Sequence, residues 1–145
     1  MKFTISVLIK KSPSDVFRYL TSPTKLTDWT QGLQSVKSIK GRRNQVGGKS
    51  KLLFKEGSTS FTVNEEVLVF KRHNAFSLLL DHKEILTTVD YFLEEEGRGT
   101  LLTAKYNIKF KNLLNRIFAI FFRGPMKTQQ SNDLKKLKKA LERSE

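Results

Sequence analysis

The chain has 145 residues, a length typical of one domain and sufficient to bury a hydrophobic core. It contains no cysteine, which excludes disulfides, thiolate zinc sites and cysteine nucleophiles. Lys and Arg number 27 against 14 Asp and Glu, and the net charge of +13 favours anionic partners such as nucleic acid, lipid headgroups or an acidic protein. A well-solvated basic protein without such a partner stays an open alternative.

The first elements are a strand and two short helices. Apart from Leu8, residues 3–9 place apolar and polar side chains in alternation, which predicts a strand. Ser12-Pro13-Ser14-Asp15 is a helix start, with Ser12 as cap and Pro13 at the first helical position, so a helix is expected over Ser12–Leu20. Ser22-Pro23 repeats that signal and predicts a second helix that ends near Trp29.

Strands separated by tight turns are expected from Ser35 to Phe110. On the longest of them we expect Phe61, Val63, Val67 and Val69 to share one face. Because consecutive strands with short links pair as an antiparallel meander, βαβ units are excluded. The predicted strands cover residues 35–39, 49–55, 60–71, 75–81, 85–93 and 100–110.

The last segment, Asn112–Glu145, has helical periodicity. Gly124-Pro125 interrupts it, so the segment is expected to be one kinked helix or two helices. Its lysines, from Lys135 to Lys139, favour a solvated helix face over a nucleic-acid site. The most apolar stretch, Leu113–Phe122, is too short to span a membrane, and the N-terminus lacks a cleavage site, so we expect a cytoplasmic protein.

Several of these pieces resemble one family. Strand 3–9 running into Ser12-Pro13, the Ser22–Trp29 segment, Val46-Gly47-Gly48, Gly99-Thr100 and the closing Leu134-Lys135-Lys136-Leu137-Lys138 occur in the order and spacing of the SRPBCC superfamily. This superfamily includes START lipid-transfer domains, the birch-pollen-allergen family and polyketide cyclase/dehydrase-like proteins. The resemblance covers essentially the whole chain and implies a single domain, 1–145.

The fold that the resemblance implies is α+β, of the helix-grip type. About seven antiparallel strands form a curved sheet wrapped on the long C-terminal helix, and two short helices follow the first strand. The function implied is binding or transport of a small hydrophobic or amphipathic, lipid-like ligand in a cavity between sheet and helix. A polyketide cyclase/dehydrase-like enzyme that uses the same cavity is one alternative, and charge-driven binding of nucleic acid or an acidic partner is another.

The cavity is expected to be lined by apolar and aromatic residues of the inner sheet face and of the helix. Tyr91 and Tyr106 are the strongest candidates, because a buried hydroxyl needs a partner that a ligand can supply. For each of the others, ordinary core packing is the competing interpretation. The predicted ligand-binding residues are Phe61, Val63, Phe76, Leu78, Val89, Tyr91, Tyr106, Ile108, Phe118, Phe121 and Phe122.

No cluster of side chains predicts catalysis. The acid–base candidates are His73, His82, Asp90, Glu65 and Glu66, and none of them is assigned a catalytic role. Two isolated histidines predict no metal site, and no cofactor motif is present, since Gly41–Gly48 lacks the spacing of a phosphate-binding loop. That basic loop could still attract an anionic headgroup. An anionic membrane surface or an acidic protein is therefore a possible second partner, and we do not expect nucleic acid to be the main one.

Overall fold

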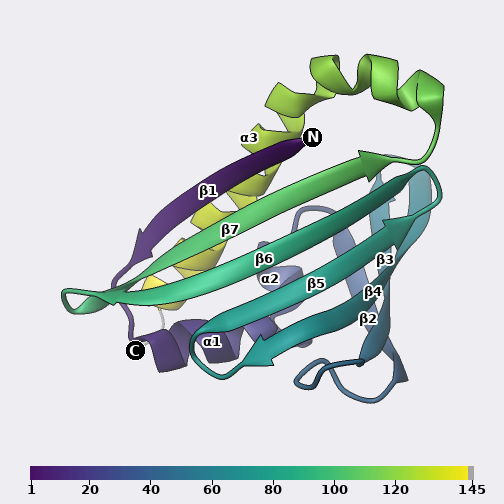
Figure 1. Ribbon diagram of the computed structural model, residues 1–145. Helices are drawn as coiled ribbons and strands as arrows, with labels where there is room; N and C mark the ends of the chain where they lie inside the picture. The colour runs from purple at the N-terminus through teal and green to yellow at the C-terminus, as the bar shows by residue number, and fades with distance from the viewer. Residues whose placement is uncertain (144–145) are drawn as a thin grey trace.

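The computed structural model describes the backbone of residues 1–143 and the side chains of 1–112 and 123–143. Seven strands form one antiparallel sheet in the order β1-β7-β6-β5-β4-β3-β2 (Figure 1). This confirms the predicted α+β helix-grip architecture. The strands are β1 (Lys2–Ile9), β2 (Leu33–Lys40), β3 (Lys49–Glu56), β4 (Thr59–Lys71), β5 (Ala75–His82), β6 (Ile85–Glu96) and β7 (Gly99–Phe110). The helices are α1 (Pro13–Thr21), α2 (Leu26–Trp29) and α3 (Leu113–Arg143).

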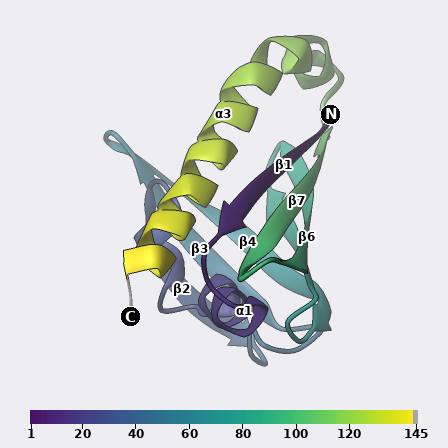
Figure 2. The ribbon, with the colours of Figure 1, turned by 90° about the vertical axis from the view of Figure 1, so that its left-hand side faces the viewer.

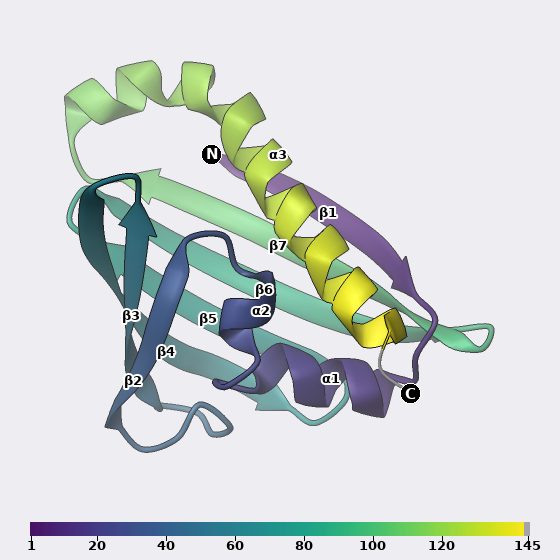
Figure 3. The same ribbon diagram turned by 180° about the vertical axis from the view of Figure 1, so that it is seen from behind.

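The sheet curves around the helices and forms two layers with them. Figure 2 shows α3 running diagonally across the inner side of the sheet, and Figure 3 shows α1 and α2 on that same side. Alternate residues of β7, from Leu102 to Phe110, are buried and meet Leu134, Leu137 and Leu141 of α3 in one core cluster. Burial of this apolar area is the main stabilising contribution to the fold.

The first helix begins as its sequence predicts, whereas the second does not. The Ser12 hydroxyl accepts a hydrogen bond from the Asp15 backbone N–H at 3.2 Å, and Pro13 opens α1. Ser22, expected to start the second helix, instead ends α1 by donating its backbone N–H to the Tyr19 carbonyl. Its hydroxyl bonds to Thr24, so α2 starts later and has no side-chain cap.

Strand β4 contains a bulge that changes which residues face inward. The pairing register with β5 shifts between Val67 and Val69. Val67 is buried, Val69 is opposite Ser77, and Phe70 pairs with the inward-facing Phe76. The prediction that Val69 shares the inner face with Val67 is therefore wrong, because one extra residue in a strand exchanges its two faces.

Helix α3 is continuous over 31 residues, with Pro125 inside it. The proline removes one backbone hydrogen bond and crowds the preceding turn, and the helix bends along its length (Figure 1). Of the two alternatives, one kinked helix is confirmed. Over the residues described, no helix has both the length and the apolar character needed to cross a membrane.

Candidate functional site

A cavity lies between the inner face of the sheet and α3. It consists of two adjoining hollows that share wall residues such as Leu52, Thr87 and Met126. The inner pocket, of about 150 Å³, reaches the centre of the sheet at Tyr91 and Tyr106. The outer pocket, of about 270 Å³, reaches the exposed β3–β4 end at Lys55 and Glu56, where it meets solvent.

Seven of the eleven residues predicted to bind a ligand lie on the walls of this cavity. Leu78, Val89, Tyr91, Tyr106 and Ile108 line the inner pocket, and Phe61 and Val63 line the outer pocket. They meet there because the meander places alternate residues of neighbouring strands side by side. Their role in ligand binding stays a prediction.

The remaining four predicted residues have other positions. Phe76 is fully buried in an aromatic cluster, with ring centroids 5.9 Å from Phe70 and 6.3 Å from Tyr91, and it serves the core behind the inner pocket. Phe118, Phe121 and Phe122 belong to the part of α3 whose side chains lie outside the described residues.

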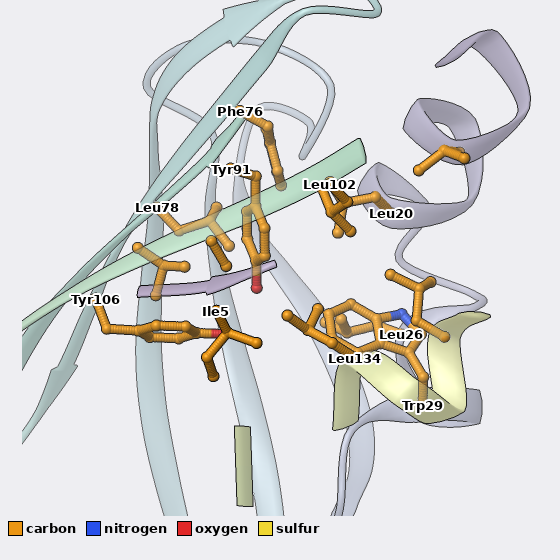
Figure 4. Close-up of a cluster of buried hydrophobic side chains, with 14 of the residues drawn as sticks. Ile5, Leu20, Leu26, Trp29, Phe76, Leu78, Tyr91, Leu102, Tyr106 and Leu134 are labelled. Atoms are coloured by element: carbon orange, nitrogen blue, oxygen red, sulfur yellow. The ribbon is translucent and has the colours of Figure 1, made fainter. Parts of the chain in front are cut away.

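Tyr91 and Tyr106 place two hydroxyl groups in the inner pocket. They come from neighbouring strands, and their rings converge in the close-up of Figure 4. The two hydroxyls are close enough to influence each other's pKa. Burial raises the pKa of Tyr91 to about 12 and raises the pKa of Tyr106 well above 10, so both remain neutral donors at physiological pH.

Asp133 of α3 adds a carboxyl group to the same pocket. It is 2% exposed, and its Oδ1 accepts the backbone N–H of Gln31 at 3.2 Å. Burial raises the pKa of Asp133 to about 6, while the Gln31 N–H and the nearby Lys136 oppose that shift. The sequence analysis missed this residue. Its signal was an acid beside Leu134 and four residues before Leu137, on the apolar side of a basic helix.

A buried ion pair closes one end of the inner pocket. Arg43 donates from Nε to Glu65 Oε1 at 2.8 Å and from a terminal nitrogen to Oε2 at 3.3 Å. Its other terminal nitrogen donates to the Leu20 carbonyl at 3.1 Å, and the guanidinium lies 5.1 Å from the centre of the Phe76 ring. The Arg43 and Glu65 side chains are 3% and 2% exposed. Arg43, expected in a basic surface loop, is thus an internal anchor for that loop.

Two buried polar atoms lack hydrogen-bond partners. Among the described residues, Trp29 Nε1 and Thr30 Oγ1 are buried and unpaired. Both residues line the inner pocket, and Trp29 packs at the end of α2 as expected. A buried donor without a partner costs about 1–3 kcal/mol, so these atoms favour a polar group or water nearby.

Of the acid–base candidates named from the sequence, Glu65 lines the inner pocket with Asp133, and the other four do not. His73 is exposed in the β4–β5 turn, and Glu66 is paired with Lys49 on the outer face at 3.8 Å. Asp90 accepts the Ser77 hydroxyl at 2.6 Å. His82 lies at the wall of the outer pocket, where its Nδ1 is 3.0 Å from the Thr62 carbonyl oxygen.

Residues 1–142 match the model of the family described as polyketide cyclase/dehydrase and lipid transport. The chain belongs to this family. The match agrees with the resemblance seen in the sequence. No curated protein sequence matches the chain.

Solved structures share the fold at low sequence identity. A conserved protein from Geobacillus kaustophilus is 20% identical, with a TM-score of 0.82 over 99% of this chain and 97% of that one. Protein MLL2253 from Mesorhizobium loti is 18% identical, with a TM-score of 0.77 over 100% and 99%. Ara h 8.0201 is 11% identical, with a TM-score of 0.70 over 94% and 97%. At these identities the likeness establishes the fold alone.

Proposed function

We propose that the protein binds a small amphipathic, lipid-like molecule in the cavity between the sheet and α3, with its polar end innermost. The observation that carries the proposal is a group of buried polar side chains at the inner end of a largely apolar cavity. The inner pocket is lined by Asp133, Tyr91 and Tyr106 together with apolar residues such as Val89 and Ile108. The outer pocket adds Phe61, Val63 and Ile85, and its charged residues Lys55 and Glu56 are exposed.

The charge of the inner pocket supports an uncharged polar end. Arg43 and Glu65 neutralise each other, and Asp133 adds a carboxylate above its pKa of about 6. A second carboxylate or a phosphate would be repelled there. A hydroxyl group can accept from a tyrosine and donate to Asp133, so an alcohol fits this pocket better than an acid.

The test is a fluorescence titration of the purified protein, since Trp29 is its one tryptophan and lines the pocket. We expect decanol to bind more tightly than decanoate. Tyr106→Phe removes one hydroxyl from the pocket and is expected to weaken decanol binding about tenfold. Tyr19→Phe is the matched control, because the Tyr19 hydroxyl bonds to Asp28 outside the cavity.

The outcomes are distinct. The proposed orientation would be refuted if Tyr19→Phe and Tyr106→Phe lost the same amount of decanol affinity, or if decanoate bound more tightly than decanol. Native mass spectrometry of protein purified gently from its own host, followed by organic extraction, identifies what it carries. Protein that neither carries nor binds an apolar molecule would refute the carrier function.

One observation favours a second candidate, an enzyme of the cyclase/dehydrase kind. A general acid or base works best with a pKa near the operating pH, and Asp133 approaches this condition beside two neutral hydroxyls. The extracted ligand, incubated with the protein, distinguishes the candidates. Conversion that is lost in Asp133→Asn with binding retained indicates the enzyme, and an unchanged ligand indicates the carrier.

A further inference from the structure

The strands β2 and β3 carry an arrangement of lysines that the fold does not require. In their pairing register Lys37 is directly opposite Lys51, and Lys40 is directly opposite Lys49. All four residues are exposed. Like charges directly opposite each other on two strands destabilise the sheet, and here two such pairs occur within one short hairpin.

Protection of a sheet edge does not account for these lysines. Lysine on an edge strand discourages pairing with another molecule, and β2 is an edge strand. Lys49 and Lys51, however, belong to β3, which is paired with β2 on one side and β4 on the other. The charges of Lys49 and Lys51 therefore do not protect a sheet edge.

Few acidic groups neutralise this surface. Within the part of the chain that the structure describes, the ion pair here is that of Lys49 with Glu66, at 3.8 Å. Lys37, Lys40 and Lys51 form no ion pair with the described residues. The positive potential is therefore available to a partner outside the molecule.

Exposed apolar side chains lie close to these lysines in the chain. Ile39, next to Lys40, is 56% exposed, and Val46, in the β2–β3 loop, is 62% exposed. Leu53, two residues after Lys51, is exposed as well. We call the four lysines with Ile39, Val46 and Leu53 the β2–β3 basic patch. Mixed lysine and aliphatic residues suit the boundary between anionic headgroups and acyl chains.

The loop that presents Val46 is held rigidly. Gly47 donates to the Val67 carbonyl at 2.8 Å, and Val67 donates to that of Gly48 at 2.9 Å, which ties the loop to β4. A Cβ on Gly48 would lie 1.9 Å from the Arg42 carbonyl oxygen, so only glycine allows this approach. With Arg43 anchored inside, Val46 remains outside without further ordering, which lowers the entropic cost of docking.

We propose that the β2–β3 basic patch docks the protein on an anionic lipid bilayer. The opposed Lys37–Lys51 and Lys40–Lys49 pairs attract the headgroups, and Ile39 and Val46 enter the interface. Nucleic acid would use the lysines alone, whereas a bilayer also uses the aliphatic side chains. This surface lies at the end of the sheet farthest from β1 (Figure 3), and its function does not depend on what the cavity holds.

The test is flotation of the protein with phosphatidylcholine vesicles that contain or lack phosphatidylserine. We expect binding only with phosphatidylserine, and weaker binding as salt rises. Each lysine near an anionic surface contributes about fivefold in affinity, so the vesicle affinity of Lys37→Glu/Lys40→Glu should fall about 30-fold or more. Lys135→Glu/Lys139→Glu makes the same change in net charge on exposed residues of α3, and its vesicle affinity should fall much less.

A stability measurement separates docking from misfolding. In Lys37→Glu/Lys40→Glu each new carboxylate is opposite a lysine of β3, so repulsive pairs become attractive. The unfolding temperature should rise by about 1–3 °C while vesicle binding falls. A loss of binding accompanied by a fall in unfolding temperature would count against the proposal.

The aliphatic residues distinguish a bilayer from another polyanion. Ile39→Ser/Val46→Ser keeps the charge, and it should weaken vesicle binding while leaving any binding to an RNA oligonucleotide unchanged. The proposal is overturned if wild-type protein does not float with phosphatidylserine vesicles. It is also overturned if both charge variants lose the same amount of vesicle affinity, or if Ile39→Ser/Val46→Ser binds vesicles as well as wild type.

Discussion

Glu65 and Glu66 are neighbours on β4, yet they lie on opposite faces of the sheet and in different environments. Glu65 points inward, is 2% exposed and accepts two hydrogen bonds from Arg43. Glu66 points outward, is 37% exposed and lies 3.8 Å from Lys49. On the outer face Lys37 and Lys51 are even placed opposite each other.

The difference shows what each environment requires of a charge. Water and counterions screen the outer face, so like charges there cost little and remain free for a partner. Inside the sheet a charge without a partner is costly to desolvate, and each buried charge among the described residues accordingly has a partner. The Arg43 guanidinium has Glu65 and the Leu20 carbonyl, and Asp133 has the Gln31 N–H.

The largest effect is expected from breaking the inner pair. Glu65→Leu leaves Arg43 buried with the Leu20 carbonyl but without its carboxylate. The free energy of unfolding, measured with urea, should fall by about 3–5 kcal/mol. Arg43→Met/Glu65→Leu removes both charges and should recover most of that loss. A double variant as unstable as the single one would show that the pair is not the cause.

A smaller effect, which depends on pH, is expected from Asp133→Asn. The folded-state pKa of about 6 is higher than the ordinary 3.8, so wild type loses stability as pH rises through this window. The penalty is complete above pH 6 and amounts to about 3 kcal/mol. The amide oxygen that Asp133→Asn introduces can still accept from the Gln31 N–H, without the buried charge.

The measurement for Asp133 is the free energy of unfolding at about pH 4 and about pH 7. Asp133→Asn should be more stable than wild type at the higher pH, and the advantage should shrink at the lower pH. Asp28→Asn is a suitable control, because Asp28 is exposed. An advantage for Asp133→Asn that is independent of pH would contradict the assigned burial of the charge.

The smallest effect is expected on the outer face. Glu66→Gln removes the partner of Lys49 and should change the free energy of unfolding by less than about 0.5 kcal/mol. Urea unfolding compares it directly with Glu65→Gln, which makes the same change on the next residue. If the two variants were equally destabilised, the contrast between the faces would be wrong.

Much of the fold follows from local signals in the sequence. The Ser12-Pro13 start, the alternation along β6 and β7 and the helical period of the last segment each specify one element. The start of the second helix was predicted wrongly because a serine such as Ser22 can either end one helix or begin the next. In the structure its backbone N–H donates to the Tyr19 carbonyl, and it therefore ends α1.

The candidate site could be predicted only in its apolar part. Residues such as Val89 and Ile108 show the inner face by alternation alone. Asp133 and Arg43 are missed because their burial depends on partners 102 and 22 residues away in the chain. Glu65, named from the sequence as an acid–base candidate, has the same strand parity as Phe61 and Val63, and that parity indicates the inner face.

The bulge at Val67–Val69 has a consequence for comparing relatives of this protein. Before it, odd-numbered residues of β4 face the helix, and after it Phe70 does. An alignment without a gap at this point, against a relative with a regular strand, would equate core positions with surface positions for the rest of β4. At identities of 11–20%, a comparison with such a relative therefore needs a one-residue gap there before any shared pocket residue is inferred.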